Sequence, residues 1–259
     1  MRIATDQITD RQQKILELLE TTEYLSISDI ASSLGIAESS ARRQVRKMEM
    51  DGVVLRTSRG IVKADNGYEE YLTDKYRIRR AEKRAIAAAA KKFIEPGDII
   101  LISGGSTTFE LSRLLRDARN IHVITTSVPI ASDLYLNPNI QVEMVGGIVD
   151  RLNGVVVSTQ ASSYLGSMHV KKAFMGADSI SIEHGITTPS YFEAEIDKLA
   201  FKTSKSVYIM ADYSKFNKVS LTKVAGLNQV HCVITDSTTS QEYLRQIEAL
   251  GTQVVRAGV

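Results

Sequence analysis

The first 35 residues carry apolar positions at the spacing of short amphipathic helices. In residues 11–21, apolar side chains recur three and four positions apart, which places them on one face of a helix. In residues 26–35, the apolar positions predict a second short helix, with Ser28 as its expected N-cap and Gly35 at its expected end. The pattern therefore predicts two consecutive helices.

Residues 37–51 predict a third helix with two chemically different faces. Ala41, Val45 and Met48 lie at positions i, i+4 and i+7 and form one narrow apolar stripe. The opposite side is polar and basic, and it carries Ser39, Arg42, Arg43, Arg46 and Lys47. This helix has one face for a protein core and one face for the phosphates and base edges of a nucleic acid.

Two short strands are predicted to follow in residues 52–64. They flank a turn at residues 57–60, and Arg56 and Arg59 lie near its tip. Three helices and a basic hairpin are the plan of a winged helix-turn-helix, in which an arginine in the major groove can bind guanine through two hydrogen bonds. The two wing arginines are expected to contact backbone phosphate or the minor groove. A small helical protein-interaction module is the alternative.

The rest of the chain alternates strand-like and helix-like segments. Residues 64–80 mix charges with tyrosines and lack an apolar stripe, so they are interpreted as a linker, and a helix is predicted at 81–94. The strand-like runs are 99–102, 121–125, 140–145, 172–175, 206–210 and 230–235. The helical stretches between and after them are 107–117, 128–136, 159–167, 191–204 and 239–250. This alternation is typical of an α/β domain with a mainly parallel sheet. The predicted organisation is a winged helix-turn-helix at 1–63, a linker at 64–80 and an α/β domain at 81–259.

The turn after the first strand of this domain has the composition of a phosphate-binding loop. Residues 103–108 read Ser-Gly-Gly-Ser-Thr-Thr and open a helix in which Thr107 and Glu110 are expected to form a capping box. Glycines permit a close backbone approach, amides at a helix start attract an anion, and hydroxyls add hydrogen-bond donors. A plain strand-to-helix connection is the alternative. The motif is neither a Walker loop nor GxGxxG, so it does not indicate nucleotide binding.

Further glycine-rich or polar turns follow the other strands. They lie at residues 125–127, 146–147, 176–178, 185–188 and 212–215. Because ligands of open parallel sheets bind beyond the carboxyl ends of the strands, these turns predict one convergent pocket. Lys215 is expected to bind a phosphate or sugar oxygen there, with an exposed surface lysine as the alternative.

The composition predicts a cellular compartment, and the charge distribution suggests a polyanionic partner, with a solvated helix face as the alternative. The 259 residues carry a net charge of +2, yet residues 37–63 hold seven basic and three acidic side chains, a local +4 on a slightly acidic body. The single cysteine, Cys232, cannot form an internal disulfide. The chain has neither an apolar signal core at its start nor an apolar run of membrane length. A soluble, cytoplasmic protein is expected.

The histidines do not suggest catalysis. His122 and His231 lie on apolar strands and are expected to be core residues, whereas His169 and His184 lie in loops without partner residues at useful spacing. The sequence therefore predicts no metal site, no Ser-His-Asp arrangement and no cofactor.

The third helix carries a resemblance to a known family. Residues 37–45, Ala-Glu-Ser-Ser-Ala-Arg-Arg-Gln-Val, resemble the run Ser-x-x-Thr-Ile-Arg-Arg-Asp-Leu of the DeoR family of bacterial transcriptional regulators. Arg42 and Arg43 match that run. The family's serine, threonine and aspartate are replaced, by Ala37, Ser40 and Gln44. Because alanine cannot cap a helix, Ser39 or Ser40 is expected to take over that role.

The α/β domain resembles the sensor domain of the same family. The similar segments are 146–147, 173–178, 185–188 and 211–216, together with the glycine-rich loop. The fold of that sensor is similar to ribose-5-phosphate isomerase, glucosamine-6-phosphate deaminase and the CoA transferases. The resemblance implies a phosphorylated sugar or polyol as effector, and Glu193 matches an acidic position of the family. Three departures, Ser103 for aspartate, Thr126 for asparagine and Ser179 for glycine, are expected to change the preferred sugar phosphate or weaken its binding.

The predicted function is a repressor of a carbohydrate-utilisation operon, relieved by its effector. A homodimer or homotetramer is expected to bind paired half-sites in double-stranded operator DNA. The alternative is a sugar-phosphate isomerase or deaminase with Asp178 or Glu193 as general base, although such an enzyme does not need a DNA reader. The predicted DNA-binding residues are Ser39, Ser40, Arg42, Arg43, Arg46, Lys47, Arg56 and Arg59. The predicted effector-binding residues are Ser103, Gly104, Gly105, Ser106, Thr107, Thr108, Thr126, Gly147, Asp178, Thr187, Glu193 and Lys215.

Overall fold

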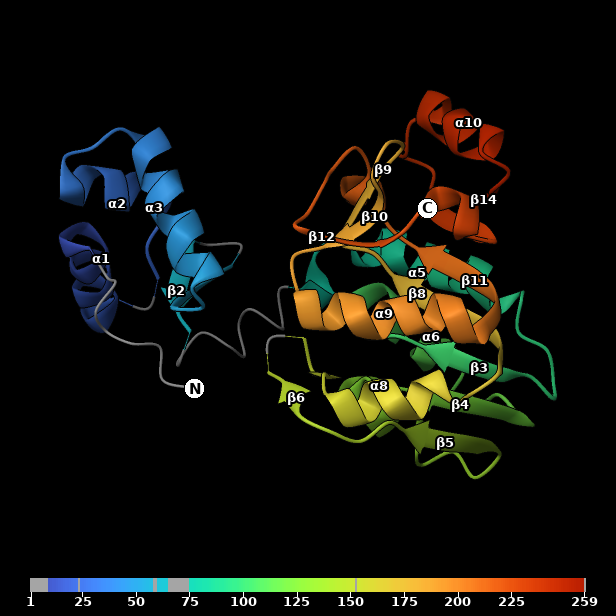
Figure 1. The fold of residues 1–259 in the computed structure, drawn as a ribbon. Coiled ribbons are helices and arrows are strands. Elements are labelled where there is room, and N and C mark those ends of the chain that lie inside the picture. Colours follow the sequence, from blue (N-terminus) through green and yellow to red (C-terminus); the bar gives the residue numbers. More distant parts are fainter. Residues whose placement is uncertain (1–8, 23, 58–59, 65–74, 152, 259) are drawn as a thin grey trace. The chain divides into compact units, whose positions relative to one another are not determined.

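The chain divides into two compact units, Met1–Ile78 and Arg79–Val259. The structure, a computed structural model, describes residues 9–22, 24–57, 60–64, 75–151 and 153–258. Figure 1 shows the helices and strands of both units. Much of the expected linker, residues 65–74, lies outside the described residues, so its boundaries stay a prediction. Within the described ranges, no helix has the length and apolar character needed to cross a membrane.

The first unit consists of three helices followed by a β-hairpin. Its elements are α1 (Asp10–Thr21), α2 (Ile27–Leu34), α3 (Glu38–Met50), β1 (Val54–Arg56) and β2 (Ile61–Lys63). The two strands pair antiparallel, with Leu55 opposite Val62. The three helices and the hairpin predicted from the sequence are thus confirmed.

The start of α2 differs from the prediction. Its N-cap is Ser26, whose Oγ accepts a hydrogen bond from the backbone N–H of Asp29 at 3.1 Å, while Asp29 Oδ2 accepts from the Ser26 N–H at 2.9 Å. The expectation of Ser28 as N-cap is wrong, because a capping box requires its hydroxyl three residues before the acid. Gly35 ends the helix as expected, with a left-handed φ of +61°.

The three helices and strand β1 each contribute a fully buried residue to the core of this unit. Ile15, Ile30, Val45 and Val54 are all fully buried, and they belong to α1, α2, α3 and β1. The apolar stripe of α3 is confirmed, since Met48 is also buried. Burial of each such side chain contributes about 1.5–3 kcal/mol, so the apolar pattern holds the polar face of α3 outward.

The second unit is built on a seven-stranded sheet whose neighbouring strands are all parallel. The strand order is β14-β13-β11-β8-β3-β4-β5. The strands are β3 (Ile99–Ile102), β4 (Ile121–Thr125), β5 (Ile140–Met144), β8 (Val170–Gly176), β11 (Ser204–Met210), β13 (Cys232–Asp236) and β14 (Gln253–Ala257). The predicted α/β class with a parallel sheet is confirmed.

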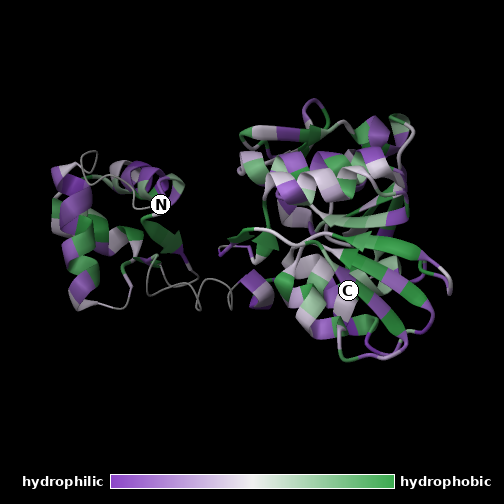
Figure 2. Ribbon diagram, turned by 60° about the horizontal axis from the view of Figure 1, so that its bottom comes forward, coloured by the Kyte–Doolittle hydropathy of each residue, from purple (hydrophilic) through white to green (hydrophobic). Residues whose placement is uncertain are grey.

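Helices cover both faces of this sheet. They are α5 (Arg80–Lys91), α6 (Ser106–Leu114), α7 (Val128–Leu134), α8 (Thr159–Gly166), α9 (Tyr191–Thr203) and α10 (Gln241–Ala249). Alternate strand residues enter different cores: Ile100 and Ile102 pack with α5, α6 and α7, whereas Leu101 packs with α8, α9 and α10. In Figure 1, α8 and α9 lie on the near face. Figure 2 shows the apolar strands between helices whose outer sides are polar.

Small antiparallel sheets were not predicted. One has the order β12-β10-β9, formed by β12 (Thr222–Ala225), β10 (Gly185–Thr188) and β9 (Ser179–Ser181). The other pairs β6 (Val149–Asp150) with β7 (Val155–Val156). These strands have two to four residues and lack a continuous run of four apolar residues like that of β3. Both small sheets follow strand ends of the large sheet.

The two strand histidines are not simple core residues. His231 is exposed, and its ring lies edge-on to Tyr208 with ring centroids 5.2 Å apart, so the core prediction for His231 is wrong. It precedes β13 and therefore lies outside the buried run. His122 is half-buried on β4, where its Nε2 lies 2.8 Å from Glu143 Oε2.

Candidate functional site

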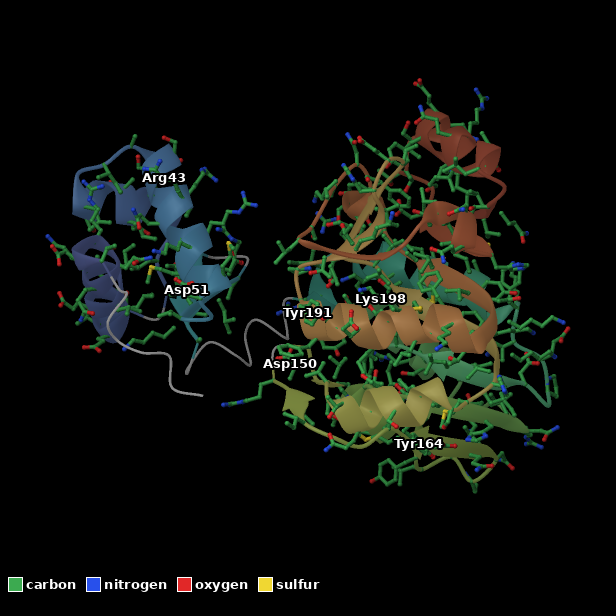
Figure 3. All side chains as sticks on the ribbon, viewed as in Figure 1. Arg43, Asp51, Asp150, Tyr164, Tyr191 and Lys198 are labelled. Carbon is green, nitrogen blue, oxygen red and sulfur yellow. The ribbon has the colours of Figure 1, made fainter. Side chains whose placement is uncertain are left out.

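The exposed face of α3 carries the predicted DNA-binding residues. Arg43, Arg46 and Lys47 are exposed, and none of their side chains forms a hydrogen bond or ion pair with a residue that the structure describes. Arg42 is also exposed, and its Nη2 lies 3.0 Å from Glu38 Oε2. Figure 3 labels Arg43 on α3. Because an exposed ion pair contributes at most about 1 kcal/mol, Arg42 can exchange its partner for a phosphate or a base.

The start of α3 lacks the side-chain cap that the sequence suggested. The N-cap is Ala37, and no side chain accepts a hydrogen bond there. The expectation that Ser39 or Ser40 caps the helix is therefore wrong, since both lie within its first turn. Ser39 is exposed and Ser40 is half-buried. The first backbone amides of α3 are therefore without a side-chain acceptor, and the start of a helix favours an anion.

The hairpin places one basic residue beside α3. Arg56, at the end of β1, has its Nε 3.5 Å from Glu49 Oε2 of α3, and both side chains are exposed. Arg59, the second predicted wing residue, lies outside the described residues. Gly60 closes the turn against Leu25, because a Cβ at Gly60 would lie 2.2 Å from the Leu25 carbonyl oxygen. Only glycine permits this approach, and so the turn geometry depends on it.

The glycine-rich loop of the second unit follows β3 and leads directly into α6. The N-cap of α6 is Gly105, and no side chain caps the helix. The predicted capping box is wrong: Thr107 and Glu110 lie inside α6, and Thr108 Oγ1 donates to the Gly105 carbonyl at 2.9 Å. The first-turn amides of α6 are therefore without a side-chain acceptor, which suits an anion.

Ser103 has a structural role in this loop. Its N–H donates to the Phe174 carbonyl at 3.0 Å, and its Oγ accepts from the Gly176 N–H at 3.2 Å. These bonds tie the loop after β3 to the end of β8. Ser103, which stands where the family often has aspartate, is thus a neutral hydrogen-bond acceptor, whereas an aspartate would add a negative charge.

A small cavity joins residues from several strand ends. Its volume is about 40 Å³, and its lining residues are Gly104, Thr126, Val155, Val156, Val157, Glu193, Ile196 and Asp197. Gly104, Thr126 and Glu193 were predicted from the sequence, and the structure brings these three together from the loops after β3 and β4 and from α9. The cavity has room for about one water molecule, whereas pockets for drug-sized ligands measure roughly 300–1,000 Å³.

Three acidic side chains lie at or near this cavity. Glu193 and Asp197 are one turn apart on α9, in the helix that begins at Tyr191 in Figure 3. Burial, and then the negative charges of Glu193 and Asp178, raise the pKa of Asp197 well above its usual range. The carboxyl group of Asp197 has no hydrogen bond or ion pair with a described residue. Its carboxyl group is therefore favoured in the neutral, hydrogen-donating form.

The other two acidic side chains have partners. Glu193 Oε1 accepts a hydrogen bond from Asn153 Nδ2, and Asp178 Oδ2 accepts from Thr188 Oγ1 at 2.8 Å. No three His, Cys, Asp or Glu residues within the described ranges are grouped so that they could hold a metal ion.

Several predicted effector residues do not line the cavity. They are Ser103, Gly105, Ser106, Thr107, Thr108, Gly147, Asp178, Thr187 and Lys215. Thr187 is buried, and its Oγ1 accepts from the Ser220 N–H at 2.8 Å, so it stabilises β10. Gly147 packs on the cavity wall, because a Cβ there would lie 2.8 Å from Val156 Cγ1. Lys215 is half-buried, and its side chain makes no hydrogen bond or ion pair with any described residue.

Sequence reasoning missed Asp197 and the β6–β7 hairpin that contributes Val155 and Val156. Asp197 follows Glu193 by four residues, so helical spacing alone could have placed both on one face. The hairpin left no such signal, because its strands have two residues each.

Larger cavities lie at the opposite end of the strands, near their amino ends. Cavities of about 330 Å³ and 540 Å³ share Pro138 and Asn139, and the first includes Asp98 and His122 near the starts of β3 and β4. None of the predicted effector residues lines either cavity. The small cavity remains the better candidate, because ligands of parallel sheets bind at the carboxyl ends of strands.

Comparison with known proteins identifies both units. A model of the DeoR C-terminal sensor domain matches residues 78–237, and a model of a winged helix-turn-helix DNA-binding domain matches residues 8–54. The winged helix-turn-helix prediction is thus confirmed.

Curated relatives match along almost the whole chain. A putative aga operon transcriptional repressor of Escherichia coli O157:H7 is 26% identical over 253 residues, covering 96% of this chain and 94% of its own. The transcriptional repressor AccR of Agrobacterium fabrum is 31% identical over 232 residues, covering 89% and 90%. Among solved structures, ribose 5-phosphate isomerase A of Methanocaldococcus jannaschii is 19% identical, with a TM-score of 0.39 over 53% of this chain and 54% of its own. Both curated relatives carry the name of a transcriptional repressor, the first of them as a putative one.

Proposed function

The chain belongs to the DeoR family of transcriptional regulators, and from this premise we propose that it represses a carbohydrate-utilisation operon under the control of a phosphorylated sugar or polyol. The observation that carries the effector half of this proposal is the convergence of Gly104, Thr126 and Glu193 on one cavity. Two relatives named as repressors, one of an aga operon, support the regulatory half. The chain acts where its DNA lies, in the cytoplasm.

On the DNA side, α3 enters the major groove. Arg42, Arg43 and Arg46 bind guanine edges or phosphates, and Lys47 binds phosphate, because their side chains are exposed on one polar face. Arg56 and Arg59 of the hairpin hold the flanking backbone or minor groove. A homodimer or homotetramer presents two such units to paired operator half-sites, since the symmetry of an operator mirrors that of its protein.

On the effector side, the ligand lies across the strand ends with its phosphate at the start of α6. The uncapped first-turn amides supply donors, and Lys215, whose side chain has no partner within the described residues, supplies a positive charge. The sugar hydroxyls face the carboxyl groups of Glu193, Asp178 and Asp197. Because the cavity measures about 40 Å³, its walls must separate when a sugar phosphate enters.

Control of DNA binding requires a difference in affinity. A ligand can change DNA binding only if it binds the DNA-competent and DNA-incompetent arrangements with different free energies. We take the effector to favour the incompetent arrangement, so that sugar phosphate relieves repression.

The test combines calorimetry with DNA binding. The full-length protein is titrated with ribose 5-phosphate, glucose 6-phosphate, glucosamine 6-phosphate, fructose 1-phosphate and glycerol 3-phosphate, and with each unphosphorylated parent. We expect at least one phosphorylated compound to bind and to release the protein from a fragment of the DNA upstream of its own gene. Lys215→Ala is expected to weaken the binding of that compound by about 1.5–3 kcal/mol, which is typical of a hydrogen bond to a charged group. If the unphosphorylated compounds bind as tightly as the phosphorylated ones, the assignment of a phosphate to the start of α6 is wrong.

A further inference from the structure

The chain enters the sensor unit at two consecutive arginines. Arg79 is the first residue of this unit, and Arg80 is the first residue of α5. Each guanidinium contacts a different element that follows a strand end. The two contacts link the entry point of the chain to the surroundings of the proposed effector site.

Arg80 contacts the helix that begins at the glycine-rich loop. Its Nε donates to Glu110 Oε1 at 3.1 Å, and the Glu110 side chain is only 6% exposed. Glu110 lies four residues after Ser106, the first residue of α6. A rigid helix of nine residues carries any displacement of its start to Glu110. Because a buried carboxylate depends strongly on its partner, that displacement must be followed by Arg80 or break the pair.

Arg79 contacts the turn that carries Lys215. Its guanidinium carbon lies 5.3 Å from the centroid of the Tyr213 ring, and its Nε lies 3.8 Å from Oδ1 of the buried Asp212. Asp212 Oδ1 also accepts from the Ser214 N–H at 3.0 Å, so it organises the short helix Tyr213–Lys215. The Arg79 Nε itself is buried without a hydrogen-bond partner.

The backbone at Arg79 is in a conformation that a non-glycine residue rarely adopts. Its φ is +53° and its ψ is +39°, in the left-handed region, at the N-cap of α5. No side chain caps α5 at this point. A residue in this region is strained unless its surroundings hold it, and the contacts to Asp212 and Tyr213 are those surroundings.

We propose that Arg79 and Arg80 are positioning residues that transmit occupancy of the effector site to the start of α5 and thus to the chain that leads to the DNA-binding unit. This inference rests on the proposed function, because it takes the start of α6 and the turn of Lys215 as the places where the phosphate binds. Ligand contact at those two places moves Glu110 and the Asp212–Tyr213 turn. The two arginines then follow, and the left-handed residue at the entry of the unit is held or released.

The pair to Glu110 offers a matched control. Arg113 also faces Glu110, with its Nη1 3.8 Å from Glu110 Oε1, but it belongs to α6 itself. Arg113→Ala therefore removes a cation from the same carboxylate without touching the entry of the chain. If the charge of Glu110 has a purely structural role, Arg113→Ala and Arg80→Ala should affect the response of α5 to the ligand equally.

Hydrogen exchange of the full-length protein tests the proposal, with inorganic phosphate as the probe and chloride at equal ionic strength as the reference. The amides to follow are the first turn of α6 and residues 83–86 of α5, where the Lys83 N–H donates to the Arg79 carbonyl at 3.1 Å. We expect phosphate to slow exchange in α6 in the wild type, Arg113→Ala and Arg80→Ala. In the wild type and in Arg113→Ala, we expect phosphate also to slow amide exchange in α5 by about fivefold, which is the lower end of typical coupling between sites. In Arg80→Ala we expect no slowing in α5.

The exchange results distinguish a failure of the coupling through the arginines from a failure of the phosphate site at α6. Equal slowing of α5 in Arg80→Ala and in the wild type overturns the coupling role, as does slowing of α6 with unchanged α5 in the wild type. Unchanged α6 in the wild type overturns the phosphate site and the coupling together. Rescue of the α5 response by Arg80→Lys supports the ion pair as the carrier.

A second variant covers the case in which Arg80→Ala does not fold. Arg79→Gly removes the guanidinium and suits the left-handed backbone, so it keeps the N-cap geometry of α5. We expect it to retain the α6 response to phosphate and to reduce the α5 response. An unchanged α5 response in Arg79→Gly overturns the role assigned to Arg79.

Discussion

Gly104 and Val155 approach each other so closely that a Cβ on Gly104 would lie 2.0 Å from Val155 Cγ1. The two residues come from the loop after β3 and from β7, and both line the small cavity. The wall of the proposed effector site therefore depends on the absence of a side chain at position 104.

Gly104→Ala is expected to destabilise the sensor unit by about 1–3 kcal/mol, because overpacking forces β7 away from the loop. It should also reduce binding of the sugar phosphate that the wild type prefers. Thermal unfolding and calorimetry measure the two effects. Gly146→Ala is the control, since a Cβ there meets nothing within 4 Å. Equal melting temperatures for the two variants would contradict the close packing.

Arg43→Ala is expected to weaken operator binding by about 1–3 kcal/mol if Arg43 contacts a base, with relaxed specificity at one position. If Arg43 contacts phosphate instead, the slope of log affinity against log salt should fall by about 1. Binding titrations at several salt concentrations distinguish the two cases. Arg11→Ala, an exposed arginine of α1, serves as the control. A double variant Arg42→Ala and Arg43→Ala with unchanged affinity and salt slope would remove the DNA-binding role of α3.

Asp197→Asn is expected to make stability less dependent on pH. The pKa of Asp197 is raised in the folded protein, so the folded state binds the proton more tightly than the unfolded state, whose aspartate pKa is about 3.9. Wild-type stability should therefore fall as pH rises from that value through the folded pKa. Asparagine cannot ionise, and the variant should be more stable than the wild type above this window. Urea unfolding across pH checks this, with the exposed Asp117→Asn as control.

Asp98→Asn is expected to have the opposite pH signature. Burial tends to raise the pKa of Asp98, but hydrogen bonds from Lys171, Lys172 and the Glu95 backbone together lower it. Its carboxylate lies 2.5 Å from Lys171 Nζ and 2.7 Å from Lys172 Nζ. The stability it contributes is present above about pH 3.9 and is lost as pH falls through the folded pKa.

Loss of one partner from a fully buried ion pair costs about 3–5 kcal/mol. Because Lys171 is half exposed, Asp98→Asn should be destabilised at neutral pH by less than this. The difference from the wild type should narrow in acid, and denaturant unfolding at several pH values measures it. A constant difference across pH would mean that shape rather than charge accounts for the loss.

The long elements could be predicted because their patterns are local. Strands Ile99–Ile102 and Ile121–Thr125 coincide with the predicted runs, since strands buried on both faces are continuously apolar. The stripe of Ala41, Val45 and Met48 likewise placed the buried face of α3 correctly. Cap residues were less predictable: Ser26 and Ser28 are both good N-caps, and only the position of Asp29 decides between them.

The candidate site was predictable only in part. Gly104 and Thr126 follow from residue type at strand ends, and Glu193 follows from the family resemblance. Thr187 instead accepts a hydrogen bond from the Ser220 backbone amide. Asp197 and the roles of Arg79 and Arg80 depend on which distant groups face them. Such contacts join residues many positions apart, and residue type does not specify them.

The sequence by itself determined the three helices and the hairpin of the first unit, six of the seven strands of the large sheet, the polar face of α3 and the glycine-rich loop after β3. Each of these depends on neighbours within a few residues. Only the tertiary structure decided that Gly104, Thr126, Val155 and Asp197 share one cavity. The strand order β14-β13-β11-β8-β3-β4-β5 brings together segments that are far apart in the chain. The physical reason is that burial of both sheet faces selects one arrangement of strands, and the carboxyl ends of those strands then carry their loops to a common edge.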